Sequence, residues 1–330
     1  MKPEISLAEP EPEEKDKTKR PSKFKTFLRN PMGVAGFFML ASIILLAIFA
    51  PFITPYDPYE PVAADTSDVL APPSPGHILG QDDAGKDVLS SVIHGARISL
   101  IVGFSAAFII LVVGSILGML AGYFGGRVDL FIMRFVDVIL VIPQLPLMLV
   151  IIAVAGRGIV NIILVIGLLS WSYMARIIRA QVMSVKERTY ILRARAIGVG
   201  HFKIMVRHIL PQVVPMMFAE LILDVSHAII SESTLSFLGL GDPTLVSWGS
   251  MLNRAFLRGA VTRGAWWFLV PPGLSLAWVA LGFNFLGNAL QEIINPRLKT
   301  HHLFNERKIV SLLGMRGRSM RTPKREEAAS

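Results

Sequence analysis

Long windows without charged residues alternate along this chain with short polar or basic segments. The two clearest windows are Met32–Ile53 and Ile98–Phe124, and each exceeds the roughly 20 residues that an α-helix needs to cross a bilayer. Four further apolar windows follow, one of which contains acidic residues: Val138–Ala155, Ile159–Ala175, about 213–240 and Ala265–Leu290. The pattern predicts an all-α polytopic membrane protein with six transmembrane helices.

The charges between the windows predict the side of the membrane on which each connection lies. The segment 54–97 carries seven acidic residues against Lys86 and Arg97, whereas the segment 176–210 is strongly basic. Because basic residues are retained on the cytoplasmic side, both termini are expected inside and 54–97 outside. The predicted outer loop 241–264 departs from this rule through three arginines, namely Arg254, Arg258 and Arg263.

These boundaries divide the chain into five parts. We expect a flexible, charged cytoplasmic N-terminus at 1–30, a first transmembrane helix at 31–54 and an external loop at 55–97. A core of five transmembrane helices follows at 98–298, and a basic cytoplasmic tail follows at 299–330. The N-terminal part contains too few apolar residues to pack, which is why we expect it to be flexible.

Composition supports a membrane protein and excludes several classes of function. Hydrophobic residues make up 52% of the 330 residues, and the mean hydropathy of +0.54 is too high for an ordinary soluble domain. The formal net charge of +9 resides mainly on the cytoplasmic face and tails, so it does not indicate nucleic-acid binding. Without cysteine, the chain has no disulfide, thiolate metal site or cysteine nucleophile.

Glycine and proline positions predict the shape of two helices. Gly114, Gly118 and Gly122 recur at four-residue spacing in the second window. Small residues one turn apart let two helix backbones approach closely, so we expect a tight helix–helix contact there. Pro143 and Pro146 are expected to bend the third span, because proline removes a backbone hydrogen bond from a helix.

The segment 80–87, which reads G-Q-D-D-A-G-K-D, resembles a phosphate-binding loop but lacks its chemistry. Such a loop ends in a serine or threonine whose hydroxyl contacts Mg²⁺, and Asp87 stands at that position. Asp82 and Asp83 would repel the phosphates, and the predicted orientation places the segment outside. We therefore exclude a nucleotide site here.

Ionisable residues in the fifth window form a candidate site within the membrane. Glu220, Asp224 and His227 share one helix face by their spacing, and Glu232 follows. Such groups are costly in a membrane and usually face a cavity or a partner. Glu220, Asp224 and Glu232 can line a polar translocation path, make inter-subunit or loop hydrogen bonds, or form a proton or metal site. No second cluster completes a metal coordination shell.

The basic segment 176–210 is the most informative part of the chain. From Arg176 to Arg207 it carries eight Lys or Arg and a single acid, Glu187. It is too long for a simple connection between two helices, which usually runs only a few residues. We therefore interpret it as a cytoplasmic surface with a role of its own.

Within this segment, Tyr190, Ala194 and Ile197 fall on one helical face. Gly198 then allows a sharp break in the backbone, and Pro211 is expected to restart the next span where a missing N–H costs little. From these residues alone, docking to a protein and contact with anionic lipid explain the segment equally well.

The same residues resemble the cytoplasmic signature loop of ABC importer permeases. That loop prefers E-A-A-x-x-x-G and ends in hydrophobic-x-Leu-Pro; here Ala194, Gly198 and the run H-I-L-P at 208–211 match. The ending H-I-L-P is common in the peptide/nickel branch of the family. Leu192 and Arg193 depart from the pattern, since the family often has Glu and Ala there.

Further stretches are similar to the same branch. The run H-I-L-G-Q-D-D-A-G-K-D-V-L-S at 77–90 resembles its H-x-L-G-T-D-x-x-G-R-D-x-L-S, and G-A-R-I-S-L follows at 95–100. S-T-L-S-F-L-G-L-G at 233–241, S-W-G at 247–249 and N-P-R-L at 295–298 also look like the family. The extra first span with its long acidic loop resembles the C-type subunit of dipeptide/oligopeptide permeases.

The resemblance, which covers roughly residues 31–298, implies a type I ABC importer permease in a bacterial or archaeal inner (plasma) membrane. It implies a heterodimer with a second homologous permease, two cytosolic ATPase subunits and an external solute-binding protein. ATP and Mg are then held by the ATPases, and this chain has no cofactor and no catalytic residue. The residues that would couple it to the ATPases are Tyr190, Arg193, Ala194, Arg195, Gly198, Lys203, His208, Leu210 and Pro211.

The implied cargo is a di- or oligopeptide, with nickel or another small solute as the alternative within the family. A different class remains open, namely an ion-coupled secondary transporter or channel that uses the face of Glu220 and Asp224. That class predicts transport driven by an ion gradient and independent of any ATPase. An intramembrane enzyme is disfavoured, because the sequence has no H-E-x-x-H or comparable cluster.

Overall fold

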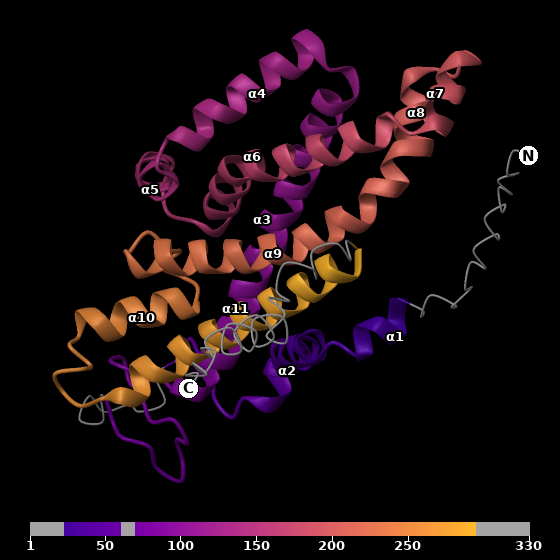
Figure 1. Ribbon diagram of the computed structural model, residues 1–330. Helices are drawn as coiled ribbons and strands as arrows, with labels where there is room; N and C mark the ends of the chain where they lie inside the picture. Colours follow the sequence, from indigo (N-terminus) through magenta and orange to yellow (C-terminus); the bar gives the residue numbers. More distant parts are fainter. Residues whose placement is uncertain (1–22, 61–69, 295–330) are drawn as a thin grey trace, which may run out of the picture.

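The computed structural model describes residues 23–60 and 70–294, and within them the protein is built from α-helices (Figure 1). An isolated bridge between Gln81 and Asp87 is the β-type pairing found there. The helices are α1 Lys23–Leu28, α2 Pro31–Ile53, α3 Val88–Phe124, α4 Gly126–Val141, α5 Gln144–Ala155, α6 Ile159–Lys186, α7 Thr189–Ala196, α8 His201–Ile204, α9 Leu210–Phe237, α10 Trp248–Leu257 and α11 Trp266–Ile294.

The number of spans agrees with the prediction. Among the described residues, five helical stretches are long and apolar enough to cross a membrane: α2, α3, α6, the continuous run His201–Phe237 and α11. The bent pair α4–α5 makes a sixth when it is counted as one span. The predicted all-α membrane fold is therefore confirmed. Residues 1–22, the tail 299–330 and the N-P-R-L run lie outside the described residues, whereas 23–28 of the expected flexible N-terminus form α1.

The central helix α3 packs closely on α6 through the predicted glycines. A Cβ atom added to Gly118 would lie 2.5 Å from the carbonyl oxygen of Ala175, and one at Gly122 would lie 2.8 Å from that of Arg179. At Gly114 the added atom would lie 2.7 Å from the Met174 Cβ. The predicted tight helix–helix contact is thus present, and it is formed by α3 and α6.

The third span is broken rather than gently bent. α4 and α5 meet at 88° across Ile142 and Pro143, while Pro146 lies inside α5. The break follows from Pro143, which lacks a backbone N–H and disfavours helical geometry in the residue before it. α4 also begins at Gly126, ahead of the predicted window, because its charged residues had interrupted the apolar pattern.

The helix α3 begins at Val88, so the connection between α2 and α3 is shorter than the predicted external loop 55–97. Asp87 caps the helix, since its carboxylate accepts hydrogen bonds from the Ser90 N–H and hydroxyl, both at 2.8 Å. The predicted start of this helix at Ile98 is too late, because it was taken from the first uncharged residue after Arg97. A single charged residue does not end a helix whose cap lies further upstream.

Two of the three arginines that violate the charge rule, Arg254 and Arg258, lie beside the acidic loop that precedes α3. Arg254 contacts Asp82 at 3.1 Å, and Arg258 contacts Asp83 at 2.9 Å, which joins α10 to the loop. The segment that resembled a phosphate-binding loop is therefore an ion-paired connection. Asp82 is fully buried, and burial raises the pKa of its carboxyl against the lowering effect of the Arg254 guanidinium.

Replacing Arg254 with methionine is expected to destabilise the protein by roughly 2 kcal/mol, because the Asp82 carboxylate would stay buried without its counter-charge. Thermal unfolding in detergent measures the loss. The double variant Asp82→Asn/Arg254→Met should regain most of it, and the exposed Arg263→Met serves as the control. A double variant as unstable as the single one would contradict this account.

Candidate functional site

The α7–α8 segment, residues 187–204, projects at the end of the molecule where α6 finishes and α9 begins (Figure 1). Its buried side is anchored by Ile191 and Ile204, which are fully buried in one cluster with residues of α3 and α6. Between the two helices Gly198 has φ +80°, a left-handed conformation that closes α7 and reverses the chain. The segment is thus a projection with a packed inner side and a defined turn, and it is not an irregular loop.

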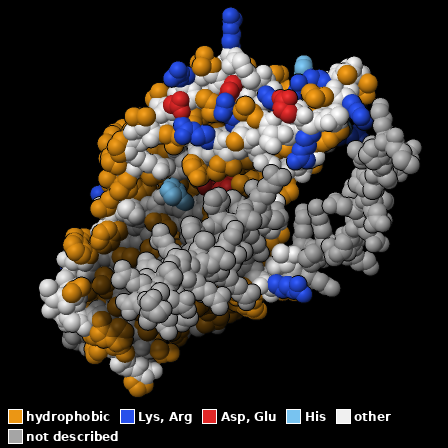
Figure 2. Space-filling model, viewed as in Figure 1, with side chains coloured by type: hydrophobic (Ala, Val, Ile, Leu, Met, Phe, Trp, Pro, Cys, Tyr) orange, Lys and Arg blue, Asp and Glu red, His pale blue; other side chains and the backbone are white. Residues whose placement is uncertain are grey.

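The outer side of the α7–α8 segment carries exposed apolar side chains among basic ones. Ile197 is 81% exposed and Phe202 is 76% exposed, and Arg193 and Lys203 are exposed beside them. Figure 2 shows Lys and Arg side chains gathered at this end of the molecule. The face with Ile197 that was predicted from spacing therefore points outward, and Ile191 supplies the packing instead.

A second set of contacts ties the segment to α3. The hydroxyl of Tyr123, near the end of α3, lies 2.8 Å from the Nδ1 of His201 in α8. The guanidinium of Arg195 lies 5.2 Å from the centre of the same Tyr123 ring, which is within the range of a cation–π contact. These contacts join α7 and α8 to the end of α3.

A third set of contacts ties α7 to α9. The amide of Gln212 donates to the Tyr190 hydroxyl at 2.5 Å and accepts a hydrogen bond from Arg188. His208 and Leu210 are half-buried at the same junction. The α7–α8 segment therefore contacts three membrane helices, counting α6, from which it continues.

The junction between α8 and α9 is a π-helical turn, Met205–Ile209, in which the Leu210 N–H bonds to the Met205 carbonyl. Pro211 follows as the second residue of α9. Pro211 therefore lies in the first turn of α9, as predicted, although helical structure already runs from His201 through the π-helical turn. The wider turn accommodates a proline, whose ring would clash with a carbonyl in a regular helix.

Two of the basic residues counted in the 176–210 segment lie in α6 and face α4. Arg176 bonds to Asp137 at 2.6 Å, and Arg179 holds both carboxylate oxygens of Asp129 at 2.5 and 2.6 Å. These arginines hold α4 against α6, and α6 extends to Lys186. The basic surface available for docking is therefore smaller than the sequence indicated.

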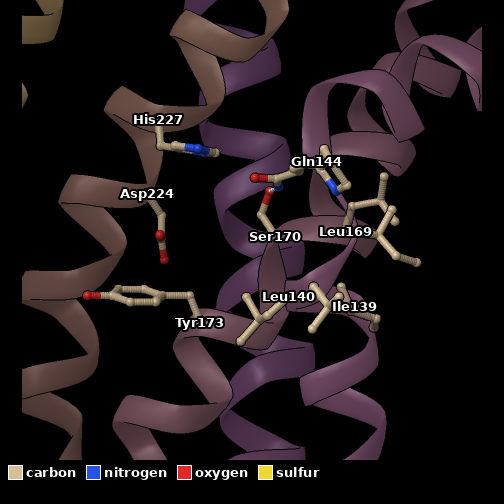
Figure 3. A pocket seen from close by; sticks show the side chains of 11 residues that line it. Ile139, Leu140, Gln144, Leu169, Ser170, Tyr173, Asp224 and His227 are labelled. Carbon is tan, nitrogen blue, oxygen red and sulfur yellow. Dashed lines mark hydrogen bonds between the residues drawn. The ribbon is translucent and has the colours of Figure 1, made fainter.

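The candidate residues within the membrane separate into different environments. Asp224 and His227 line a cavity of about 410 Å³ with residues of α4, α5 and α6 (Figure 3). Figure 3 shows the His227 ring projecting from α9 toward Gln144 and Ser170, and the Asp224 carboxylate directed toward the ring of Tyr173. Gln144 donates to the Ser170 hydroxyl at 2.6 Å.

The two other acidic candidates lie away from this cavity. Glu220 accepts a hydrogen bond from Gln291 of α11 at 2.7 Å. Glu232 is buried near the outer end of α9, where it accepts hydrogen bonds from three serines: Ser99, Ser233 and Ser236. The structure thus brings Asp224 and His227 together and leaves Glu220 and Glu232 in separate hydrogen-bond networks.

Residues 114–300 match the family model described as the binding-protein-dependent transport system inner membrane component. The chain belongs to this family. Residues 23–73 also match the N-terminal transmembrane domain of oligopeptide transport permease C. The protein is therefore a multi-pass membrane permease and a transport subunit, and its resemblance to ABC importer permeases is confirmed.

Curated relatives agree over most of this permease. The dipeptide transport system permease protein DppC of Bacillus subtilis is 35% identical, over 87% of this chain and 90% of its own. The di/tripeptide transport system permease protein DppC of Pseudomonas aeruginosa is 36% identical, over 84% and 91%. The oligopeptide transport system permease protein OppC of Bacillus subtilis is 34% identical, over 83% and 88%. All three are similar C-type permeases.

Sequence reasoning missed the neutral polar residues of the cavity. Gln144 comes from α5, and Ser170 and Tyr173 come from the run S-W-S-Y of α6; none of them is charged, so they did not stand out within the apolar windows. The one available signal was Pro143, which marks the break beside Gln144. The contact between Tyr123 and His201 gave no sequence signal, because the two residues are far apart in the chain.

Proposed function

We propose that this permease is one half of the membrane pathway of an ATP-driven importer of di- or oligopeptides. It pairs with a second homologous permease, receives cargo from an external solute-binding protein and is driven by two cytosolic ATPase subunits. ATP and Mg²⁺ are held by those subunits. The observation that carries this proposal is the α7–α8 segment, a rigid projection joined to α3, α6 and α9.

The shape of the α7–α8 segment favours a protein cleft over a lipid surface. A helix that lies in the interface needs a long apolar face toward the lipid. α7 has only 8 residues, and its fully buried apolar residue, Ile191, faces the permease itself. The exposed Ile197 and Phe202 at the tip, flanked by Arg193 and Lys203, suit insertion into a cleft with an acidic rim.

The contacts of the segment supply the transmission that coupling needs. When the ATPase subunits close on ATP, they move the α7–α8 segment, and Tyr123 and Gln212 transmit that movement to α3 and α9. We assign the coupling role to the residues predicted from the signature loop. To these we add Ile191, Phe202, Tyr123 and His201. Such coupling requires a two-state element biased from both ends, and the membrane helices of the paired permeases provide it.

Purification of the tagged permease from its own cells tests the assembly. We expect a second permease and two ATPases to co-purify, and we expect proteoliposomes with the solute-binding protein to accumulate labelled dialanine only with ATP. Uptake that follows an ion gradient without ATP would contradict the proposal and favour the secondary transporter. Accumulation of nickel in place of the peptide would reject the peptide as cargo and leave the ATP-driven importer intact.

A further inference from the structure

The cavity of about 410 Å³ lies where the backbone leaves helical geometry inside a membrane span. Ile142 and Pro143, the residues of the 88° break, line it together with Gln144. Non-helical backbone at membrane depth is tolerated where it is buried in protein or lines a polar cavity. The break and the cavity therefore occur at the same place, as expected when non-helical backbone lines a polar cavity.

Asp224 brings a carboxylate to this cavity near the midpoint of α9. Its Oδ2 atom is buried and has no hydrogen-bond partner among the described residues. The neighbouring Glu220 differs in this respect, because Gln291 donates to it. Since a buried carboxylate oxygen without a donor is costly, Asp224 is a site that awaits a donor from outside the chain.

The remaining lining decides the charge of the group that fits. No lysine or arginine of the described residues lines the cavity, and its polar side chains besides Asp224 are Gln144, Ser170, Tyr173 and the imidazole of His227. Gln144 uses its amide N–H toward Ser170, so its carbonyl oxygen stays free to accept. Ser170 adds a hydroxyl oxygen beside it. The cavity thus offers several acceptors around one negative charge.

The two helix ends at the break do not reverse this preference. α4 ends at Val141 with its partial negative charge, and α5 begins at Gln144 with its partial positive charge. These opposite partial charges lie beside the same cavity and offset each other. The full charge of Asp224 therefore sets the sign, and a compact cation with several N–H donors is the matching ligand.

We propose that this cavity binds the terminal ammonium group of the transported peptide, with Asp224 as its counter-charge and Gln144 as a further acceptor. The proposal rests on the proposed peptide transport. A terminal ammonium has three N–H donors, which matches the acceptors present. The apolar wall, including Ile139, Leu140 and Leu169, accommodates the first side chain of the peptide.

Cysteine protection in the assembled transporter tests this assignment, because the permease has no cysteine of its own. A reporter is introduced at Leu140 in the cavity wall, and a neutral maleimide labels it in membranes of the complete transporter. At about ten times its Kd, trialanine is expected to slow labelling roughly tenfold, whereas N-acetyl-trialanine leaves it unchanged. Asp224→Asn should abolish the protection by trialanine.

Two matched variants separate this effect from general changes. Glu220→Gln alters the carboxylate one turn away that Gln291 already satisfies, so it should retain protection. A reporter at Val261, which is 70% exposed outside the cavity, should label at the same rate with and without peptide. Equal protection by both peptides, or protection that persists in Asp224→Asn, would overturn the assignment.

ATP-driven uptake of trialanine by the parent transporter is measured alongside. Its absence would reject the proposed peptide transport itself. Uptake without any protection at Leu140 would leave the peptide importer intact and reject only the ammonium site.

Discussion

Replacing Gly198 with leucine is expected to lower ATP-driven uptake about tenfold or more while the permease remains inserted in the membrane. Gly198 has φ +80°, and this left-handed conformation costs a residue with a Cβ atom, such as leucine, about 1–2 kcal/mol. The space around Gly198 is open, so the cost comes from the backbone and not from a clash. The turn between α7 and α8 would shift, and the exposed tip at Ile197 would move with it.

The matched control at this position is Gly198→Asn, because asparagine tolerates the left-handed conformation. We expect it to retain most of the uptake, although it adds a side chain of similar size. Uptake of labelled dialanine and ATPase activity stimulated by the solute-binding protein are measured for both variants at equal abundance. Normal uptake by a well-expressed Gly198→Leu permease would refute the coupling role of the turn.

Replacing Gly118 with valine is expected to be the most damaging change to folding. Its Cβ would lie 2.5 Å from the backbone carbonyl oxygen of Ala175, and no rotation of a side chain relieves that overlap. Overpacking a core typically costs about 1–3 kcal/mol, and contact with backbone places this variant at or above the upper end. We expect an apparent Tm lowered by about 10 °C in detergent, or loss of folded permease from the membrane.

Gly158→Val is the control for Gly118, because nothing lies within 4 Å of a Cβ added at Gly158 and its backbone is extended. Folded amount is followed by size-exclusion chromatography of a fluorescent fusion as a function of temperature. If Gly118→Val and Gly158→Val unfold at the same temperature, the close approach of α3 and α6 does not stabilise the permease.

The features that depend on one segment at a time were predictable from the sequence. Apolar windows locate the spans, because a bilayer requires a minimum length of apolar helix. Gly118 and its neighbours marked the contact on α3, and Pro143 marked the break in the third span. Gly198 marked the turn of the α7–α8 segment, since a positive φ favours glycine.

The features that depend on two segments were not predictable in the same way. In the sequence, Arg176 and Arg179 belong to a basic segment with no evident acidic partner. In the structure, carboxylates of α4 pair with both of them. Glu220 and Asp224 share one helix face, yet Gln291 of α11 satisfies the first and not the second. Helix spacing alone cannot tell which neighbouring helix packs against a given residue, so these assignments required the fold.

The π-helical turn at Met205–Ile209 sets the rotational register of everything beyond it. One extra residue in a helix turns the chain that follows by about 100° about its axis. Deleting a single residue there would convert the turn to regular α-helix and swing the Asp224 face of α9 away from the break in the third span. The α7–α8 segment and the membrane cavity thus share an angular alignment about the axis of α9 that depends on one inserted residue.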